Sequence, residues 1–201
     1  GAAAAVVHRL TLDDFLGFNL EERGVQVTSQ LSVTGTMDLV NVRVKEAASD
    51  GMFMYLTVQY SLKDDQDSAL IFGDDMAYAL ETVRAHQTLP NHLDIAAFNS
   101  AKNRYWLQAD RLTCLDNLGG SRDSYTTFTL YESPVSVVVM CWMDIRAEDA
   151  FDAFLFPENA AGYPEAISIA MNPKLYVYKD GAKPAAAEDA YHYIGNLADY
   201  L

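Results

Sequence analysis

Hydrophobic and polar residues alternate most regularly in residues 40–62, and this stretch organises the rest of the fold prediction. Apolar residues occupy every second position from Val40 to Val44, which is the period of a strand with one buried face. A turn is expected around Asp50-Gly51, because glycine tolerates positive φ and aspartate bonds readily to its own backbone. A second alternating run follows at once, with Met54 to Leu62 as its apolar side and Phe53 to Gln59 as the opposite side, each at every second position. The stretch therefore predicts a β-hairpin.

The same period predicts five further strands, at residues 25–33, 104–113, 124–132, 135–145 and 166–178. Ser133-Pro134 joins two of them so tightly that they are expected to be antiparallel neighbours. The last strand is interrupted at Asn172-Pro173, which suits an edge position or a bulge because proline has no backbone N–H to donate. The chain thus has about seven predicted strands.

Short helices are predicted from apolar residues that recur with the helical period, at residues 10–22, 74–83, 90–101 and 185–201. Residues 147–156 fit the same period, but this segment is short and Pro157 follows it. For the segment 10–22, an extended strand is the alternative. The segment 74–101 is long for a connecting loop, so we interpret it as a helical insertion. Its apolar stripes should pack over a sheet edge or face, and a chain without it is expected to fold.

Many strands, few helices and no alternating βαβ pattern favour a mainly β fold. We expect an antiparallel immunoglobulin-like β-sandwich that forms a single domain over residues 10–201. The helical insertion at about 74–101 and a C-terminal helix would be added to this sandwich.

Composition and net charge limit the classes of partner that this chain is expected to bind. The chain has 201 residues, of which 50% are apolar, and its formal net charge is −14. Such an excess of acidic groups argues against nucleic acid or an anionic membrane surface as the main partner. No apolar run reaches the roughly 18 residues that span a bilayer. The start of the chain, Ala2 to Val7, is typical either of the end of a membrane anchor or signal segment, or of a frayed terminus, so residues 1–9 are expected to be a trimmed tether or disordered.

Two cysteines, Cys114 and Cys141, are too few for a disulfide framework. Both lie in or beside predicted strands, where a cysteine behaves as a small buried hydrophobic residue. A bridge between neighbouring strands is the alternative, and a catalytic thiol is the least favoured interpretation.

The sequence singles out no metal site. The four histidines lie on unrelated segments and lack the spacing of zinc ligands; they are His8, His86, His92 and His192. The densest carboxylate group fits no EF-hand frame, which leaves a loose surface calcium site or a solvated acidic loop; it comprises Asp64, Asp65, Asp67, Asp74 and Asp75.

Catalytic and cofactor motifs are absent from the sequence as well. There is no nucleophile elbow, no phosphate-binding glycine loop and no dinucleotide fingerprint. Most aromatic residues on the strands are expected in the core, although an outward residue such as Trp106 would suit a sugar-binding platform. We therefore assign no catalytic, cofactor-binding or metal-binding residue and no cofactor.

The hairpin carries a family resemblance. Its first strand reads Val42-x-Val44-x-Glu46-Ala47-x-Ser49-Asp50-Gly51, its second begins Tyr55-Leu56-x-Val58, and Gly24-Val25-x-Val27-Thr28 precedes both. The pattern resembles the extracytoplasmic domains of membrane-anchored anti-sigma-factor-like proteins and lipoproteins of Gram-positive bacteria. A closing strand of that family is loosely echoed by Ile167, Ile169, Pro173 and Tyr176. The helical segment 74–101 has no counterpart in the pattern.

The resemblance implies a β-sandwich outside the cell that contacts the membrane only through an N-terminal tether ending at Ala2 to Val7. Such a domain would sense, bind or scaffold, with an unidentified protein or small ligand as its partner and without enzymatic activity. Two alternatives stay open: a secreted carbohydrate-binding or carbohydrate-active module, and a structural component of a virion or other assembly.

Overall fold

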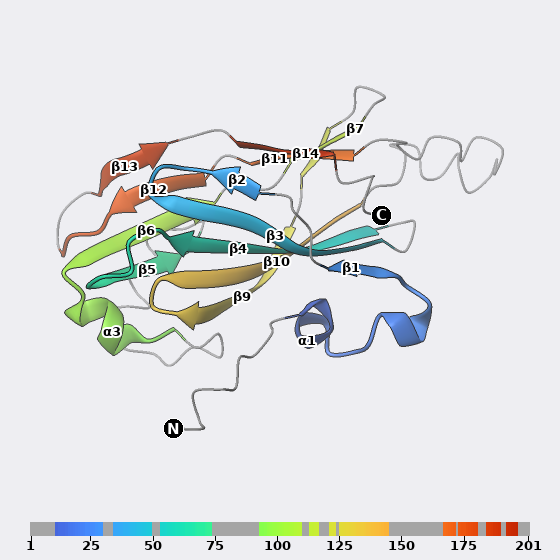
Figure 1. The fold of residues 1–201 in the computed structure, drawn as a ribbon, viewed down its shortest axis with the longest axis horizontal. Helices are drawn as coiled ribbons and strands as arrows, with labels where there is room; N and C mark the ends of the chain where they lie inside the picture. Colours follow the sequence, from blue (N-terminus) through green and yellow to red (C-terminus); the bar gives the residue numbers. More distant parts are fainter. Residues whose placement is uncertain are drawn as a thin grey trace.

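The fold is mainly β (Figure 1). The computed structural model describes residues 11–29, 34–49, 53–73, 93–109, 113–116, 121–123, 125–144, 167–171, 173–180, 184–189 and 192–196. These residues form fourteen strands, two short α-helices and one 3-10 helix. The segment 147–156, which fits the helical period, and the first predicted helix of the 74–101 segment lie outside the described residues.

The largest sheet has six strands, all antiparallel. Its order is β1-β3-β4-β10-β9, and β2 pairs with another part of β3. The strands are β1 (Val27–Ser29), β2 (Thr34–Thr36), β3 (Val40–Ser49), β4 (Phe53–Leu62), β9 (Tyr125–Ser133) and β10 (Ser136–Asp144). The two hairpins predicted from the sequence, β3–β4 and β9–β10, form its centre and one edge.

Two small sheets of four strands each complete the β structure. The first has the order β13-β12-β6-β5, with β5 (Ser68–Phe72), β6 (Asn103–Ala109), β12 (Pro173–Val177) and β13 (Ala185–Asp189). The second has the order β14-β11-β7-β8, with β7 (Thr113–Asp116), β8 (Ser121–Asp123), β11 (Ile167–Met171) and β14 (His192–Asn196). Figure 1 shows them one after the other along the length of the molecule.

Three stretches of chain each give one strand to both small sheets, in the same order. This arrangement corrects the strand count of about seven. The stretch 166–178 becomes two strands in different sheets, and six further strands add to the predicted ones: β2, β5, β7, β8, β13 and β14. The arrangement also corrects the edge position or bulge expected for the interruption of the strand at 166–178. Both β11 and β12 have a neighbour on each side, and the chain changes sheet between Met171 and Pro173. Proline is accommodated there because it is the first residue of β12, where a donor is least needed.

The predicted C-terminal helix at 185–201 is wrong for residues 185–189 and 192–196, and the rest of it lies outside the described residues. The alanine-rich sequence favours a helix locally, but the structure has β13 and β14 there. These strands pair with β12 and β11, and such long-range pairing overrides a weak local preference.

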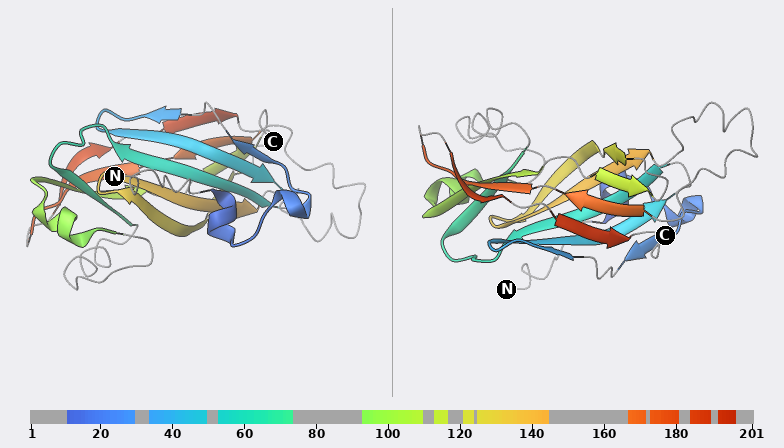
Figure 2. Two further views of the ribbon diagram at one scale, coloured as in Figure 1. Left: turned by 60° about the horizontal axis from the view of Figure 1, so that its bottom comes forward. Right: turned by 90° about the horizontal axis from the view of Figure 1, so that it is seen from above.

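The core lies between one face of the six-stranded sheet and the sheet that contains β5, β6 and β12. A single cluster of buried side chains joins the two sheets, including Val42, Val58 and Val139 from the former and Leu70, Leu107 and Leu175 from the latter. Cys141 is buried in the same cluster, as expected for a small hydrophobic residue, whereas the side chain of Cys114 lies outside the described part. Figure 2 shows the sheets from two further directions.

The strands β5 and β6 are parallel, which gives the segment between them a structural role. Parallel neighbours need a crossover connection of a dozen or more residues, usually with a helix. The helix α3 (Ile95–Ser100) belongs to this connection, with Asp94 as its N-cap. Because Leu93, Ile95 and Phe98 are part of the core, we expect that a chain without residues 93–101 would not fold. The helix α3 does pack against the edge strand β5 as predicted.

The N-terminal segment forms a shorter helix than the one predicted at 10–22. The helix α1 (Leu12–Leu16) stops at Gly17, and a 3-10 helix (Glu21–Arg23) ends at Gly24. Both glycines have positive φ, 76° and 79°, which glycine adopts at little cost. None of the helices in the described ranges is long and apolar enough to cross a membrane.

Candidate binding surface on the six-stranded sheet

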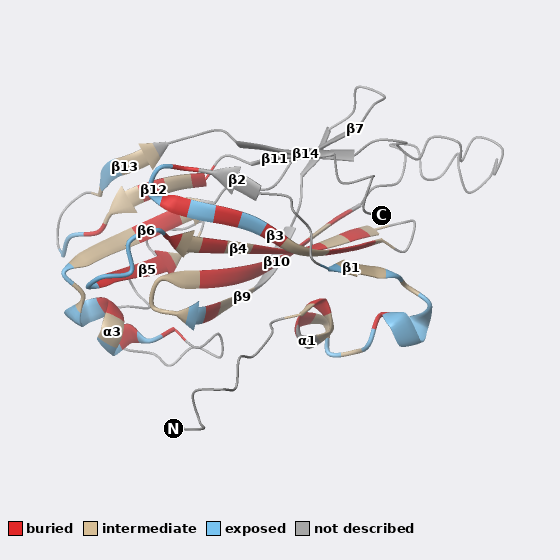
Figure 3. Cartoon of the chain, in the orientation of Figure 1, coloured by how far each residue is buried: buried red, intermediate tan, exposed pale blue. Residues whose placement is uncertain are grey.

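The outer face of the six-stranded sheet, opposite the core, is divided into two halves of different character. Along β3 the burial of successive residues alternates, so that Asn41 and Arg43 are exposed between buried valines (Figure 3). Toward the other end of the same face, apolar residues of the sheet form a second buried cluster with the N-terminal segment. We call these the polar half and the covered half.

In the covered half, the N-terminal segment is held against the sheet by apolar packing and by a hydrogen bond. Leu12 and Phe15 of α1 pack in one cluster with Val138 and Met140 of β10. The backbone N–H of Leu12 donates to Oε1 of Glu46 on β3, at 2.9 Å. A carboxylate at the first turn of a helix satisfies a backbone donor that has no partner within the helix.

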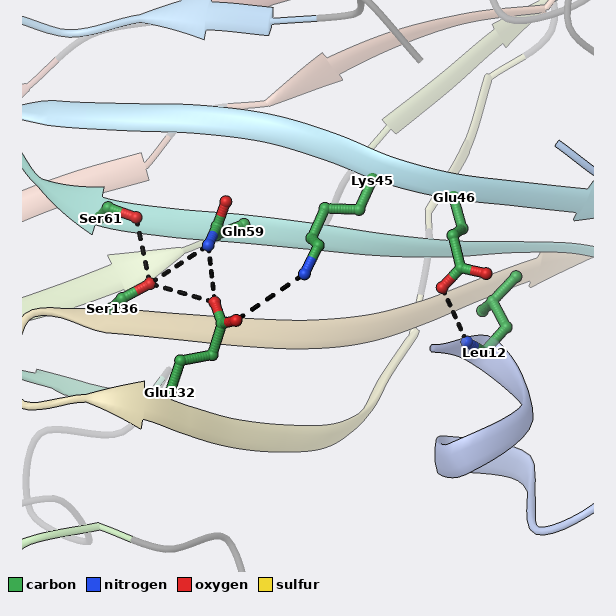
Figure 4. A network of polar contacts seen from close by, with 7 residues as sticks. All are labelled: Leu12, Lys45, Glu46, Gln59, Ser61, Glu132 and Ser136. Atoms are coloured by element: carbon green, nitrogen blue, oxygen red, sulfur yellow. Dashed lines mark hydrogen bonds and ion pairs between the residues drawn. The ribbon is translucent and has the colours of Figure 1, made fainter. Parts of the chain in front are cut away.

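The polar half contains a hydrogen-bonded network around the carboxylate of Glu132 (Figure 4). Nε2 of Gln59 donates to Oε1 of Glu132 at 2.6 Å, and Oγ of Ser136 donates to the same oxygen at 3.2 Å. Nζ of Lys45 lies 3.8 Å from Oε2 of Glu132. Ser61 extends the network, because its Oγ lies 3.1 Å from Oγ of Ser136.

Two bulges bring the charged members of this network together. The register of β3 against β4 shifts between Val44 and Glu46, so Lys45 is the extra residue. The register of β9 against β10 shifts where Ser133 and Tyr131 pair with successive residues, so Glu132 is the extra residue there. Bulges re-aim side chains out of the regular alternation. Here they allow an ion pair across three strand spacings, or about 14 Å of sheet.

The regular registers of the two central strands place the polar members. Ser61 of β4 is paired with Ser136 of β10, and Gln59 is paired with Val138 two positions further along. On the other side of β4, Gln59 is paired with Arg43 of β3. Four adjacent strands therefore contribute to one polar surface.

The network holds the side chains of its residues in place but contributes little to the free energy of folding. The side chains of Lys45 and Glu132 are 24% and 22% exposed, and an ion pair so close to solvent contributes about 0–1 kcal/mol. Glu132 as a whole residue is exposed, because its main chain lies on the edge strand β9. Side chains that are already held in place lose less entropy when a partner binds. Chemically, the surface offers hydrogen-bond donors and acceptors at fixed positions, beside the exposed Asn41 and Arg43.

In the acidic loop that was a candidate calcium site, two of the described aspartates accept hydrogen bonds from the backbone. Oδ1 of Asp64 accepts the backbone N–H of Gln66 at 2.9 Å, and Oδ1 of Asp67 accepts that of Lys102 at 3.3 Å. Asp74 and Asp75 lie outside the described residues, as do His8, His86 and His92, and the side chain of His192 is not described either. Among the side chains that the structure does place, no group of three could hold a metal ion.

Trp106 does not face outward, which corrects its proposed role in a sugar-binding platform. The residue is 6% exposed, and its ring stacks on that of Tyr176 with centroids 4.8 Å apart. Its Nε1 donates to the carbonyl oxygen of Gly73 at 2.9 Å. The indole therefore anchors the start of the crossover between β5 and β6.

Sequence reasoning singled out none of the network residues. The alternation of β4 placed Gln59 on the face opposite the core, which is correct, but nothing in the sequence pairs it with Glu132. A usable signal was the lysine-glutamate step that breaks the valine alternation of β3, because a polar pair inside an alternating strand is typical of a bulge.

Comparison with known proteins gives no family for this chain. No protein-family model matches it, and no curated protein matches it. It is similar to a solved structure described as the crystal structure of the conserved domain protein from Bacillus anthracis, with 8% sequence identity and a TM-score of 0.41. The similarity covers 83% of this chain and 46% of that one, so the chain spans less than half the length of that protein. A likeness of this degree carries no conclusion about family or function.

Proposed function

We propose that this protein is a non-enzymatic binding or scaffolding domain that contacts its partner through the polar half of the six-stranded sheet. The observation that carries the proposal is the network around Glu132, which fixes side chains from four strands on one surface. Asn41 and Arg43 are exposed beside it and extend the same surface along β3. A partner that binds here meets donors and acceptors that need little rearrangement.

We propose further that the domain is an immunoglobulin-like sandwich located outside the cell on a membrane tether. The resemblance to extracytoplasmic anti-sigma-factor-like domains supports this location. Its strongest matches lie on β3 and β4, the hairpin that also carries Asn41, Arg43 and Gln59. The core shared by the six-stranded sheet and a four-stranded sheet supports the sandwich.

Labelling of a single introduced cysteine tests the location. The variant Ala96→Cys, combined with Cys114→Ser, is expressed from the complete gene in cells of the source organism. Because position 96 is exposed and lies outside the proposed binding surface, and Cys141 is buried, a membrane-impermeant maleimide should label the variant in intact cells but not the Cys114→Ser background. Labelling only after lysis would place the domain inside the cell and overturn this part of the proposal.

Site-specific photo-crosslinking tests the binding surface. A photo-reactive amino acid at position 43 should give a discrete crosslinked species in those cells, and the same group at position 96, exposed on α3, should not. Replacing Gln59 and Lys45 by alanine should weaken the crosslink from position 43, because the network then loses two of its donors. Equal crosslinking from both positions, or none, contradicts the proposal.

The partner's chemistry then separates this function from the alternatives. A crosslink to a different protein supports a binding or scaffolding domain, and binding of the purified domain to arrayed glycans would instead indicate a carbohydrate-binding module. A crosslink to a second copy, with a symmetric oligomer in analytical ultracentrifugation, would favour the assembly component.

A further inference from the structure

A second surface feature lies where β6 begins and β12 ends. Residues 102–105 and 177–180 line an open depression with a volume of about 340 Å³. The two strands are antiparallel neighbours, and their pairing continues to Tyr178, whose backbone N–H donates to the carbonyl oxygen of Arg104 at 2.8 Å. The walls of the depression are thus held by the sheet itself.

The net charge of the residues that line this depression is positive, whereas that of the whole chain is negative. Three cationic residues line the depression, Lys102, Arg104 and Lys179, against one acidic residue, Asp180. The whole chain has 14 lysines and arginines against 28 aspartates and glutamates. A local excess of cations in so acidic a protein attracts anions that the rest of the surface repels.

Arg104 is fixed in place before any ligand binds. Its side chain is 18% exposed, and Nη2 lies 3.2 Å from Oδ2 of Asp180. The guanidinium carbon lies 5.1 Å from the ring centre of Tyr178 and 5.9 Å from that of Phe98. These two rings also contact each other edge to face, with centroids 5.1 Å apart. An arginine that is stacked on aromatic rings keeps its planar donors in one orientation.

The ion pair with Asp180 leaves Arg104 available to a ligand. The side chain of Asp180 is 74% exposed, so the pair contributes little and readily opens. A guanidinium has five N–H donors in a fork that matches the two oxygens of a carboxylate or a phosphate. Lys102 and Lys179 are exposed, line the same depression and add positive charge without a fixed geometry.

We propose that this depression binds a small oxyanion, a carboxylate or a phosphate, with Arg104 as the central ligand and Lys102 and Lys179 as flanking cations. The site is separate from the polar half of the six-stranded sheet, since its residues come from β6, β12 and the segments that adjoin them.

Titration of the ¹⁵N-labelled protein with inorganic phosphate and, separately, with citrate tests this proposal at constant ionic strength. Amide resonances of residues 102–105 and 177–180 should shift and saturate with at least one anion. The anion that saturates at the lower concentration identifies the phosphate or the carboxylate as the preferred chemistry. Absence of saturable shifts at these residues with both anions overturns the proposal.

Matched variants show whether the cations are responsible. Arg104→Gln should weaken binding tenfold or more, and the double variant Lys102→Gln/Lys179→Gln, which changes exposed residues only, should weaken it several-fold. Lys174→Gln lies on the same strand, β12, but outside the depression, and should bind as the unchanged protein does. Should Arg104→Gln fail to fold, the double variant decides. Equal weakening by Lys174→Gln would indicate non-specific attraction and overturn the site.

Discussion

At the scale of single residues, the buried hydroxyl group of Thr57 is an unfavourable feature of the fold. Thr57 alternates along β4 with the core residues Leu56 and Val58, so it faces the outer side of the sheet, where it is paired with Glu46 and Met140. It is fully buried, and its hydroxyl has no hydrogen-bond partner within the described part of the chain. A buried polar group without a partner costs about 1–3 kcal/mol.

Replacing this hydroxyl by a methyl group should therefore stabilise the protein. We expect Thr57→Val to raise the free energy of unfolding by about 1 kcal/mol in urea denaturation, because it removes the polar atom and keeps the shape. Thr57→Ser is the matched control, since it keeps the hydroxyl, loses a buried methyl group and should cost about 1 kcal/mol. A destabilised Thr57→Val would show that the hydroxyl does have a partner, such as a buried water.

At the scale of elements, the crossover between β5 and β6 is where the structure departs most from the sequence-based architecture. The part of it that the structure describes packs into the main core through Leu93, Ile95 and Phe98. The ring of Phe98 is 1% exposed and contacts Tyr178, next to the end of β12. An element that contributes this much buried surface is part of the folding unit.

We accordingly expect Phe98→Ala to lower the free energy of unfolding by about 3–5 kcal/mol, as large-to-small changes of buried aromatic residues do. Ala96→Ser, at an exposed position of the same helix, should change the free energy of unfolding by less than about 0.5 kcal/mol.

Replacing residues 74–101 by a short Gly-Ser linker should prevent folding, and the unfolding curve should then lack a cooperative transition. A deletion variant that unfolds cooperatively would restore the interpretation of this segment as an insertion.

At the scale of the whole molecule, the net charge affects the stability of the folded chain. With a formal charge of −14, the folded chain repels itself more than an expanded chain does, because folding brings the carboxylates closer together. Salt screens this repulsion: the Debye length falls from about 30 Å at 0.01 M to about 8 Å at 0.15 M ionic strength.

Raising sodium chloride over that range should therefore raise the melting temperature. Introducing lysine at two exposed acidic positions, Glu21→Lys and Asp38→Lys, adds four charge units and brings the net charge from −14 to −10. The salt response of this variant should be smaller. An unchanged melting temperature in both proteins would show that self-repulsion does not limit stability.

The sequence by itself determined the mainly β class and the two tight hairpins. In β3–β4 and β9–β10 the partner strand follows within a few residues, so alternation and turn residues specify the pairing locally. It also determined which face of β4 is buried, because the side-chain period of two leaves no other choice.

Only the tertiary structure decided the rest. The strands β13 and β14 exist because β12 and β11 offer them partners, and no local signal in an alanine-rich stretch reports a partner elsewhere in the chain. The same holds for the network on the polar half. Lys45 and Glu132 are 87 residues apart in sequence and meet because two bulges turn them toward each other across β4 and β10. Contacts of this kind depend on sheet order and register, which are properties of the assembled sheet rather than of any one strand.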